Sequence, residues 1–208
     1  MGRGGLIPVE NRLAEIGPEP EGNTPLDDDE AAGLIPGHLT TRGQLNEWEQ
    51  ANISAAMEWL HDRETEEAIL EPAFLNELHR RMFGSTWTWA GRYRKTEKNI
   101  GVAPYQISED LLNLLADVRY WIEHDTFPVD EIGARFHHRL VSIHPYPNGN
   151  GRHARLAADL LLESLGAKRF TWGSGNLDQQ GELRSRYLHA LKEADKGRIG
   201  ELTAFCRE

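Results

Sequence analysis

The residues in this sequence with the clearest chemical potential lie in one run, Ile143–Arg155, which reads IHPYPNGNGRHAR. His144 is a candidate general base, because an imidazole can accept a proton near neutral pH. Arg152 and Arg155 lie three positions apart, which places them on one face if the chain is helical there. Their planar guanidinium groups suit phosphate oxygens. The run therefore indicates proton transfer beside a bound polyphosphate.

The three residues before the arginines predict how such a phosphate is held. Gly149 and Gly151 flank Asn150, and glycines let a phosphate approach the main chain closely. A helix that begins here directs its first N–H groups outward, and phosphates bind at such helix starts. Taken singly, a Gly-Asn-Gly turn or a histidine before proline is an ordinary loop feature. Their combination in one run is far more specific.

Two helices must position this run. The first is marked by an apolar stripe at helical spacing, formed by Ile132, Phe136, Leu140 and Ile143. Pro145 ends that helix and favours an extended backbone for His144, since a right-handed helical residue clashes with a following proline ring. The second helix follows at once and carries on its apolar side Leu156, Leu160 and Leu161.

The remaining chain is predicted to be mostly helical. Its periodicity favours helices at about residues 41–61, 72–83 and 108–124, and at two C-terminal segments marked by Leu183–Leu191 and Ile199–Phe205.

Two segments depart from the helical pattern. Residues 92–103 break the helical period and predict a short β-hairpin. Residues 1–38 are rich in Gly, Pro and acidic side chains, which predicts an extended N-terminal arm with one helical turn between Asp28 and Ala32. The fold class is therefore an all-α domain over residues 39–208 with a small β-hairpin.

The composition narrows the class of protein. The chain has 208 residues, a formal charge of -10 and a mean hydropathy of -0.58. An acidic chain argues against direct nucleic-acid binding, and the lack of a long apolar run argues against a membrane protein. The single cysteine, Cys206, excludes an internal disulfide and suits a reducing compartment. We therefore expect a cytoplasmic location.

The run resembles the Fic motif, His-Pro-Phe-x-(Asp/Glu)-Gly-Asn-Gly-Arg-x-x-Arg. Tyr146 replaces the phenylalanine and Asn148 replaces the acid. The likeness covers roughly residues 40–206 and implies a Fic-like helical bundle with a β-hairpin flap beside the active-site loop. The segments at residues 45–53 and 87–91 also resemble the subgroup called mobile mystery protein B, which implies a helix-turn-helix regulator as a partner.

The resemblance implies the transfer of AMP from ATP to a Ser, Thr or Tyr hydroxyl of a target protein. His144 would deprotonate that hydroxyl. The α-phosphate would lie on the backbone of residues 149–151 with help from the Asn150 side chain, and Arg152 and Arg155 would hold the outer phosphates. Asn148 would stand where family members bind Mg²⁺ through a carboxylate, although an amide oxygen brings no formal charge.

Two further implications concern the surroundings of this loop. The hairpin is expected to dock an extended target segment by main-chain pairing, with the candidate docking residues Lys95, Thr96, Asn99, Ile100 and Gly101. Many family members are inhibited by a glutamate that pairs with the second motif arginine, here Arg155. The sequence has no clean copy of that glutamate's motif, so the candidates are Glu47, Glu49 and Glu58.

Three alternatives remain open from the sequence. The chain could bind a nucleotide as a regulatory partner without turnover, or it could transfer a nucleotide other than AMP, because nothing in the sequence fixes the base. A zinc site at His137, His138 and His144 is disfavoured, because no pair among them has helical i,i+3 or i,i+4 spacing and no cysteine assists.

Overall fold

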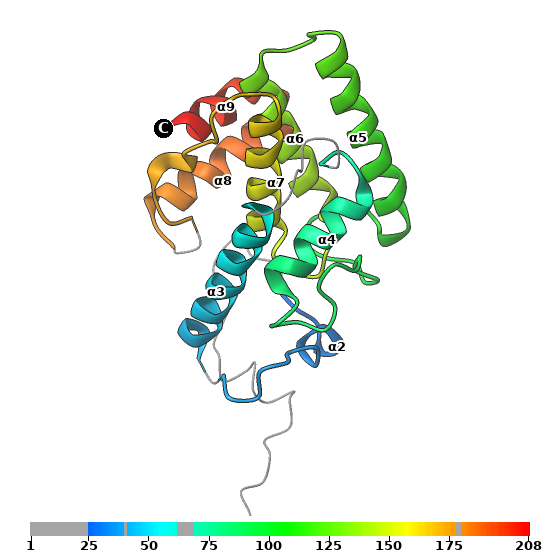
Figure 1. The fold of residues 1–208 in the computed structure, drawn as a ribbon, viewed down its shortest axis with the longest axis vertical. Helices are drawn as coiled ribbons and strands as arrows, with labels where there is room; N and C mark the ends of the chain where they lie inside the picture. The colour runs from blue at the N-terminus through cyan, green and yellow to red at the C-terminus, as the bar shows by residue number, and fades with distance from the viewer. Residues whose placement is uncertain (1–24, 40, 62–68, 178–179) are drawn as a thin grey trace, which may run out of the picture.

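The computed structural model describes residues 25–39, 41–61, 69–177 and 180–208. Within these ranges the regular structure is helical, with one isolated β-bridge between Leu34 and Trp87 and no strand (Figure 1). The elements are α2 (Asp28–Ala31), α3 (Arg42–His61), α4 (Pro72–Phe83), η1 (Pro104–Gln106), α5 (Ile107–Glu123), α6 (Val129–Ile143), α7 (Asn150–Ser164), η2 (Trp172–Ser174), α8 (Glu182–Asp195) and α9 (Ile199–Arg207). The part of the predicted arm at residues 1–24 lies outside the described residues.

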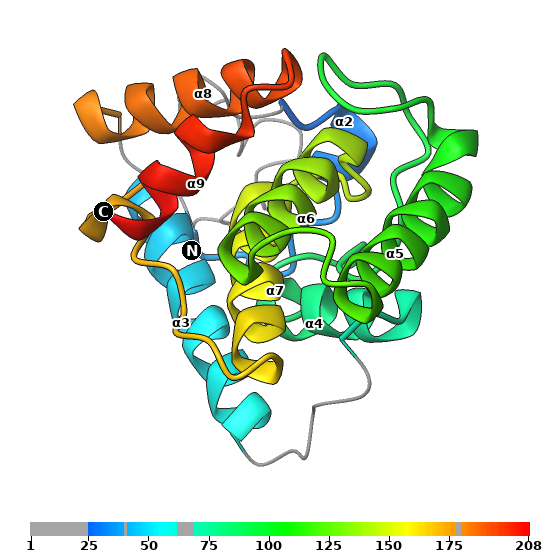
Figure 2. The same cartoon turned by 90° about the horizontal axis from the view of Figure 1, so that it is seen from above.

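Helices α6 and α7 lie at the centre of the bundle, and the other long helices surround them (Figure 2). Helix α6 packs on α5 and α9, α7 packs on α4, and α8 packs on α9. The predicted apolar faces of the two central helices are buried, because their leucine, isoleucine and phenylalanine side chains belong to the core cluster. In the part of the chain that the structure describes, no helix is both long and apolar enough to cross a membrane.

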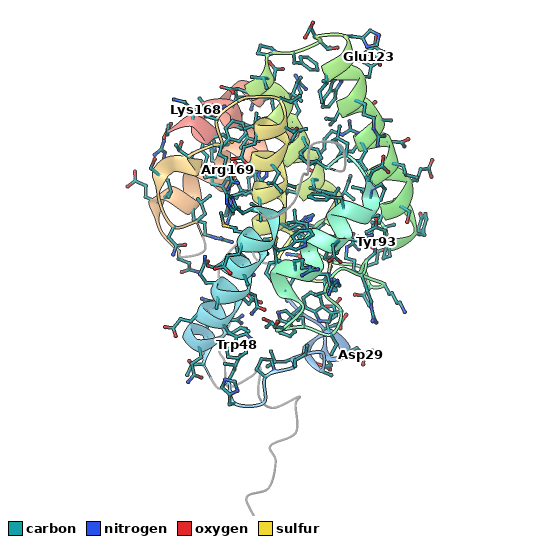
Figure 3. All side chains as sticks on the ribbon, in the orientation of Figure 1. Asp29, Trp48, Tyr93, Glu123, Lys168 and Arg169 are labelled. Atoms are coloured by element: carbon teal, nitrogen blue, oxygen red, sulfur yellow. The ribbon has the colours of Figure 1, made fainter. Side chains whose placement is uncertain are left out.

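Helix α3 begins as predicted. The Thr41 hydroxyl accepts from the Gln44 N–H at 3.2 Å, and the Gln44 side chain accepts from the Thr41 N–H at 3.2 Å, which is a capping box. Trp48 is 37% exposed, and its ring meets His38 edge-on near the start of α3 (Figure 3). Glu49 is buried instead, at 5% exposure.

The predicted β-hairpin is wrong, because residues 92–103 contain no strand. Their main chain bonds to the candidate active-site loop rather than to itself: the Arg94 N–H donates to the Pro145 carbonyl at 2.9 Å, and the Val102 N–H donates to the Ile143 carbonyl at 3.3 Å. A two-stranded hairpin alone is marginally stable. We call residues 92–103 the flap segment.

The described end of the predicted arm docks on the body of the protein. Its short helix α2 forms at the predicted turn, with a capping box between Asp27 and Glu30. The Glu30 carboxylate also forms an ion pair with Lys98 of the flap segment. The Thr88 N–H donates to the Gly33 carbonyl at 2.9 Å. The arm therefore fixes the flap segment from its outer side.

Candidate active site

All predicted catalytic, nucleotide-binding and metal-binding residues line one pocket. The motif residues in its wall are His144, Asn148, Gly149, Asn150, Gly151, Arg152 and Arg155. Helix α3 adds Glu49, helix α8 adds Tyr187, and the flap segment adds Ile100. The other predicted docking residues, Lys95, Thr96, Asn99 and Gly101, do not line it.

His144 ends helix α6 in a left-handed backbone conformation, with φ 55° and ψ 60°. The extended conformation expected before Pro145 is therefore wrong. Proline excludes the right-handed helical region for His144, but a residue that ends a helix commonly turns left-handed. Histidine is enriched among the non-glycine residues that adopt this region. This turn places the imidazole in the pocket wall.

The imidazole of His144 is held in its neutral form. It is 5% exposed, and burial, followed by the nearby positive charge of Arg94, lowers its pKa from 6.5 to about 4. A depressed pKa means that the uncharged ring dominates at neutral pH, so the nitrogen can accept a proton. Negative phosphates that enter the pocket oppose the effect of Arg94 and raise this pKa.

Arg94 supports His144 from the flap segment, a role that sequence reasoning missed. Its Nε donates to the His144 carbonyl at 2.7 Å, and its Nη1 donates to the Thr96 carbonyl at 2.9 Å. Its Nη2 donates to the Val102 carbonyl. Gly101 closes the packing, since a Cβ there would lie 2.7 Å from the His144 Cβ. The flap segment and the catalytic loop therefore form one braced unit.

Tyr146 is the anchor beneath the loop. It is fully buried, and its hydroxyl donates to Asn76 Oδ1 at 2.9 Å. Its ring stacks on His79 with centroids 3.7 Å apart. His79 Nδ1 accepts from the Gly91 N–H at 3.0 Å, which leaves its Nε2–H to donate to the Asn148 carbonyl, also at 3.0 Å. This buried network fixes the position of the loop relative to α4.

The Asn150 side chain braces the loop. Its Oδ1 accepts from the Tyr146 N–H at 2.9 Å, and its Nδ2 donates to the Tyr146 carbonyl at 2.7 Å. The expectation that this side chain holds the α-phosphate is not supported by these contacts, because both of its polar atoms are engaged with the main chain. Asn150 contributes to the pocket through its place at the first residue of α7.

The start of α7 faces the pocket. Gly149 precedes the helix with φ 78°, and no side chain caps its first N–H groups. These groups carry partial positive charge and have no partner within the helix itself. The Asn148 side chain instead accepts from the Gly149 N–H at 2.6 Å, one residue earlier. The helix start can therefore receive an anion.

The two motif arginines differ in their surroundings. Arg152 forms an ion pair of 2.6 Å with Glu49, whose other oxygen accepts from Trp87 Nε1 at 2.7 Å. The guanidinium of Arg155 lies 6.0 Å from the centre of the Tyr187 ring. Among the three candidate glutamates, Glu49 is thus the one in contact with the motif, and it contacts the first arginine. The expected partner was Arg155.

Gly149 and Gly151 make a matched pair for a stability measurement. A Cβ on Gly149 would lie 2.7 Å from the Phe83 ring at a positive φ, so we expect Gly149→Ala to cost about 3 kcal/mol of unfolding free energy. A Cβ on Gly151 would meet only Arg155 Nη1, at 3.8 Å, so Gly151→Ala should retain or slightly raise stability. Thermal unfolding measures both. Equal melting temperatures would contradict this assignment.

The three histidines considered for zinc have separate environments. His137 Nε2 lies 3.0 Å from the Tyr187 hydroxyl, and His138 Nε2 lies 2.8 Å from Asp195 Oδ1. His144 faces the pocket. Within the described ranges, no group of three or more His, Cys, Asp or Glu side chains is arranged to hold a metal ion.

Sequence comparison connects this pocket to known proteins. Residues 69–162, which include the whole motif, match the Fic/DOC family. The chain is 32% identical over 135 residues to protein adenylyltransferase fic-1 of Caenorhabditis briggsae, an alignment that covers 63% of this chain and 25% of that protein. Protein adenylyltransferase Fic of Drosophila virilis is 32% identical over 134 residues, or 62% and 26% of the two chains. The chain thus spans about a quarter of the length of these relatives.

Solved structures share the fold. A Fic-1 fragment from Caenorhabditis elegans superposes with a TM-score of 0.64 at 26% identity, over 96% of this chain and 58% of that chain. The N-terminal Fic domain of a Bartonella quintana Bep effector protein, solved with bound ADP, gives a TM-score of 0.64 at 18% identity, over 82% and 86%. The motif residues of the pocket, 144–155, therefore lie within the segment of this chain that matches the Fic/DOC family, residues 69–162.

Proposed function

We propose that this chain transfers AMP from ATP to a Ser, Thr or Tyr hydroxyl of a target protein. The observation that carries the proposal is the shared pocket: a neutral, buried His144 faces the same space as the start of α7 and the two arginines. The curated relatives are named protein adenylyltransferases, and one structure of the same fold holds ADP. These names support the reaction class.

The proposed reaction needs one base and one anion site. The target hydroxyl oxygen forms a bond to the α-phosphorus of ATP, and its proton passes to the His144 imidazole. The bond between the α-phosphorus and the bridging oxygen breaks, and pyrophosphate leaves with that electron pair. The start of α7 stabilises the charge on the α-phosphate, while Arg152 and Arg155 hold the departing phosphates.

Mg²⁺ accompanies ATP, but the residues of this pocket fit the ion poorly. Mg²⁺ favours carboxylates together with substrate phosphates. The motif offers the neutral amide of Asn148, whose oxygen accepts from the Gly149 N–H. The Glu49 carboxylate, also in the pocket wall, is shared between Arg152 and Trp87. No step of the proposed reaction therefore runs through a metal held by this chain.

Asn148→Asp should restore a carboxylate at the family's metal position. One aspartate oxygen can still accept from the Gly149 N–H, while the other becomes available to the metal. We expect the Mg²⁺ concentration for half-maximal transfer to fall about tenfold. A magnesium titration of the labelling rate measures this, with Asn148→Ala, which removes the one side-chain oxygen, as the control. An unchanged magnesium requirement in Asn148→Asp would contradict the assignment of position 148 as the metal position.

The flap segment is the proposed docking site for the target, even though it is not a hairpin. Lys95, Thr96, Asn99 and Ile100 are exposed along it, beside the loop that carries His144. A target segment in extended form can pair with this exposed main chain and bring its hydroxyl to the pocket. The specificity for the target would then depend little on side chains.

Lys95→Pro tests the docking proposal, because proline removes an N–H and fixes φ. We expect labelling of protein targets to fall about tenfold while ATP binding stays unchanged. Lys95→Ala is the matched control, since it removes the same side chain and keeps the N–H. Equal labelling by Lys95→Pro and Lys95→Ala, with both folded, would contradict docking through this main chain.

Incubation with ATP labelled at the α-phosphate and a cell lysate tests the function itself. Label on protein that depends on this chain supports AMP transfer. Nucleotide binding without label favours the alternative of a nucleotide-binding regulatory partner. Competition by the other nucleoside triphosphates determines the base preference. The helix-turn-helix regulator implied by the subgroup resemblance is a proposed second partner, which purification of the chain with that protein would test.

A further inference from the structure

Helices α6, α7 and α8 meet at a buried polar chain next to the pocket. Tyr187 of α8 lies 4% exposed in the pocket wall, and its hydroxyl is 3.0 Å from Nε2 of His137 on α6. The Arg155 guanidinium of α7 lies 6.0 Å from the centre of the Tyr187 ring, with a side-chain hydrogen bond to that tyrosine. Tyr187 lies beyond the family match at residues 69–162.

The chemistry of the guanidinium fixes the direction of one of these hydrogen bonds. A guanidinium only donates, so the Tyr187 oxygen accepts from Arg155. The direction of the second hydrogen bond, between the Tyr187 hydroxyl and Nε2 of His137, depends on the tautomer of His137. Burial, followed by the charge of Arg155, lowers the pKa of His137 to about 3, so its ring is uncharged. The chain therefore runs from Arg155 through Tyr187 to a neutral His137.

We propose that Tyr187 and His137 are positioning residues that direct Arg155 toward the outer phosphates of ATP, an inference that rests on the proposed function. A free arginine side chain has high rotamer entropy, which a fixed acceptor reduces before the ligand arrives. A tyrosine hydroxyl is a neutral acceptor, so its contact with Arg155 does not offset the charge of the guanidinium. Arg152 differs in this respect, because its contact with the Glu49 carboxylate is an ion pair.

A purely structural role for the same residues predicts a different result. The Tyr187 ring also packs on Phe205, with centroids 5.8 Å apart, and His137 packs on Trp172 at 4.6 Å. Loss of these contacts would loosen the packing of the helices and weaken the binding of every ligand alike. Loss of the hydroxyl alone should weaken the binding only of ligands that contact Arg155.

The variant Tyr187→Phe keeps the ring and removes the hydroxyl. Calorimetry should measure the binding of ATP and of AMP, since AMP lacks the outer phosphates. We expect the Kd for ATP to rise about tenfold and the Kd for AMP to change less than twofold. Tyr105→Phe is the matched control, because Tyr105 is 84% exposed and lies outside the pocket wall. His137→Phe, which removes the hydrogen-bond partner of the tyrosine hydroxyl, should shift the ratio of the two Kd values in the same direction.

Two other results for Tyr187→Phe would overturn the inference. Equal weakening of ATP binding and AMP binding would show a structural role. Unchanged affinities for both nucleotides would show that the hydroxyl has no role. If the wild-type protein binds ATP no better than AMP, Arg155 does not bind the outer phosphates as proposed. In that case the NMR signal of the Arg155 Nε–H in ligand-free protein tests whether Tyr187 still positions the arginine. Its broadening in Tyr187→Phe supports the positioning chain, and an unchanged signal rejects it.

Discussion

His144→Ala is expected to reduce AMP transfer by about 10³-fold while ATP still binds. The imidazole is buried and neutral in the pocket wall, where it can take the proton of the attacking hydroxyl. The phosphates are assigned to other groups, namely the start of α7 and the two arginines. The loss should therefore appear in the labelling rate and not in the Kd for ATP measured by calorimetry.

The control for this variant must separate chemistry from folding. Removal of the His144 ring enlarges the pocket, in whose wall the ring lies, and Arg94 Nε donates to the main-chain carbonyl of residue 144. That hydrogen bond survives the substitution, so we expect a loss of about 1–2 kcal/mol in unfolding free energy and a folded protein. His124→Ala, at an exposed position on the surface, is the matched histidine control. Transfer by His144→Ala at the wild-type rate would remove the general base from the proposal.

The helices could be predicted from the sequence because their signals are local. Apolar spacing located both ends of α5 to within one residue and identified the core-facing residues of α6 and α7, and Thr41 marked the start of α3. The motif residues could be placed in one pocket for the same reason, since a helix end, a short loop and a helix start keep near neighbours together.

The errors arose where a distant partner decides the structure. From the sequence alone, Glu49 is a charged residue on a helix surface. In the structure it is buried, because Trp87 and Arg152, which are far away in sequence, supply its hydrogen bonds. The flap segment contains residues that favour strands, but its N–H groups at residues 94 and 102 bond to main-chain carbonyls of the loop at residues 143–145, and no hairpin forms. A local sequence pattern cannot show that a distant loop competes for these hydrogen bonds.

The positioning contacts were missed for a related reason. Arg94, His79 and Tyr187 carry no motif around them, and each acquires its role from a segment more than forty positions away. The signal available in the sequence was chemical type alone: a basic residue in the flap segment and histidines on otherwise apolar helix faces. Such residues are usually satisfied structurally, so they could not be ranked as site residues before the fold was known.

The carboxylate of Glu49 should compete with the outer phosphates of ATP for Arg152. The pair is 2.6 Å long, and the Glu49 side chain is almost entirely buried against Trp87. We expect Glu49→Gln to lower the Kd for ATP about tenfold and to raise the transfer rate by a similar factor, because the arginine regains its charge for the ligand. Glutamine can still accept from Trp87 through its amide oxygen, so the fold of α3 is retained.

The sign of the effect distinguishes inhibition from preorganisation. If Glu49 only orients Arg152 for the ligand, Glu49→Gln must weaken ATP binding and slow transfer. If Glu49 competes with ATP, the variant without ligand loses about 2 kcal/mol of unfolding free energy, since Arg152 loses its partner. Bound ATP then restores this stability, because its phosphates take the place of the carboxylate. The rise in melting temperature on ATP addition should then be larger in Glu49→Gln than in the wild type. Glu47→Gln, at an exposed position on the same helix, should behave as the wild type in both measurements.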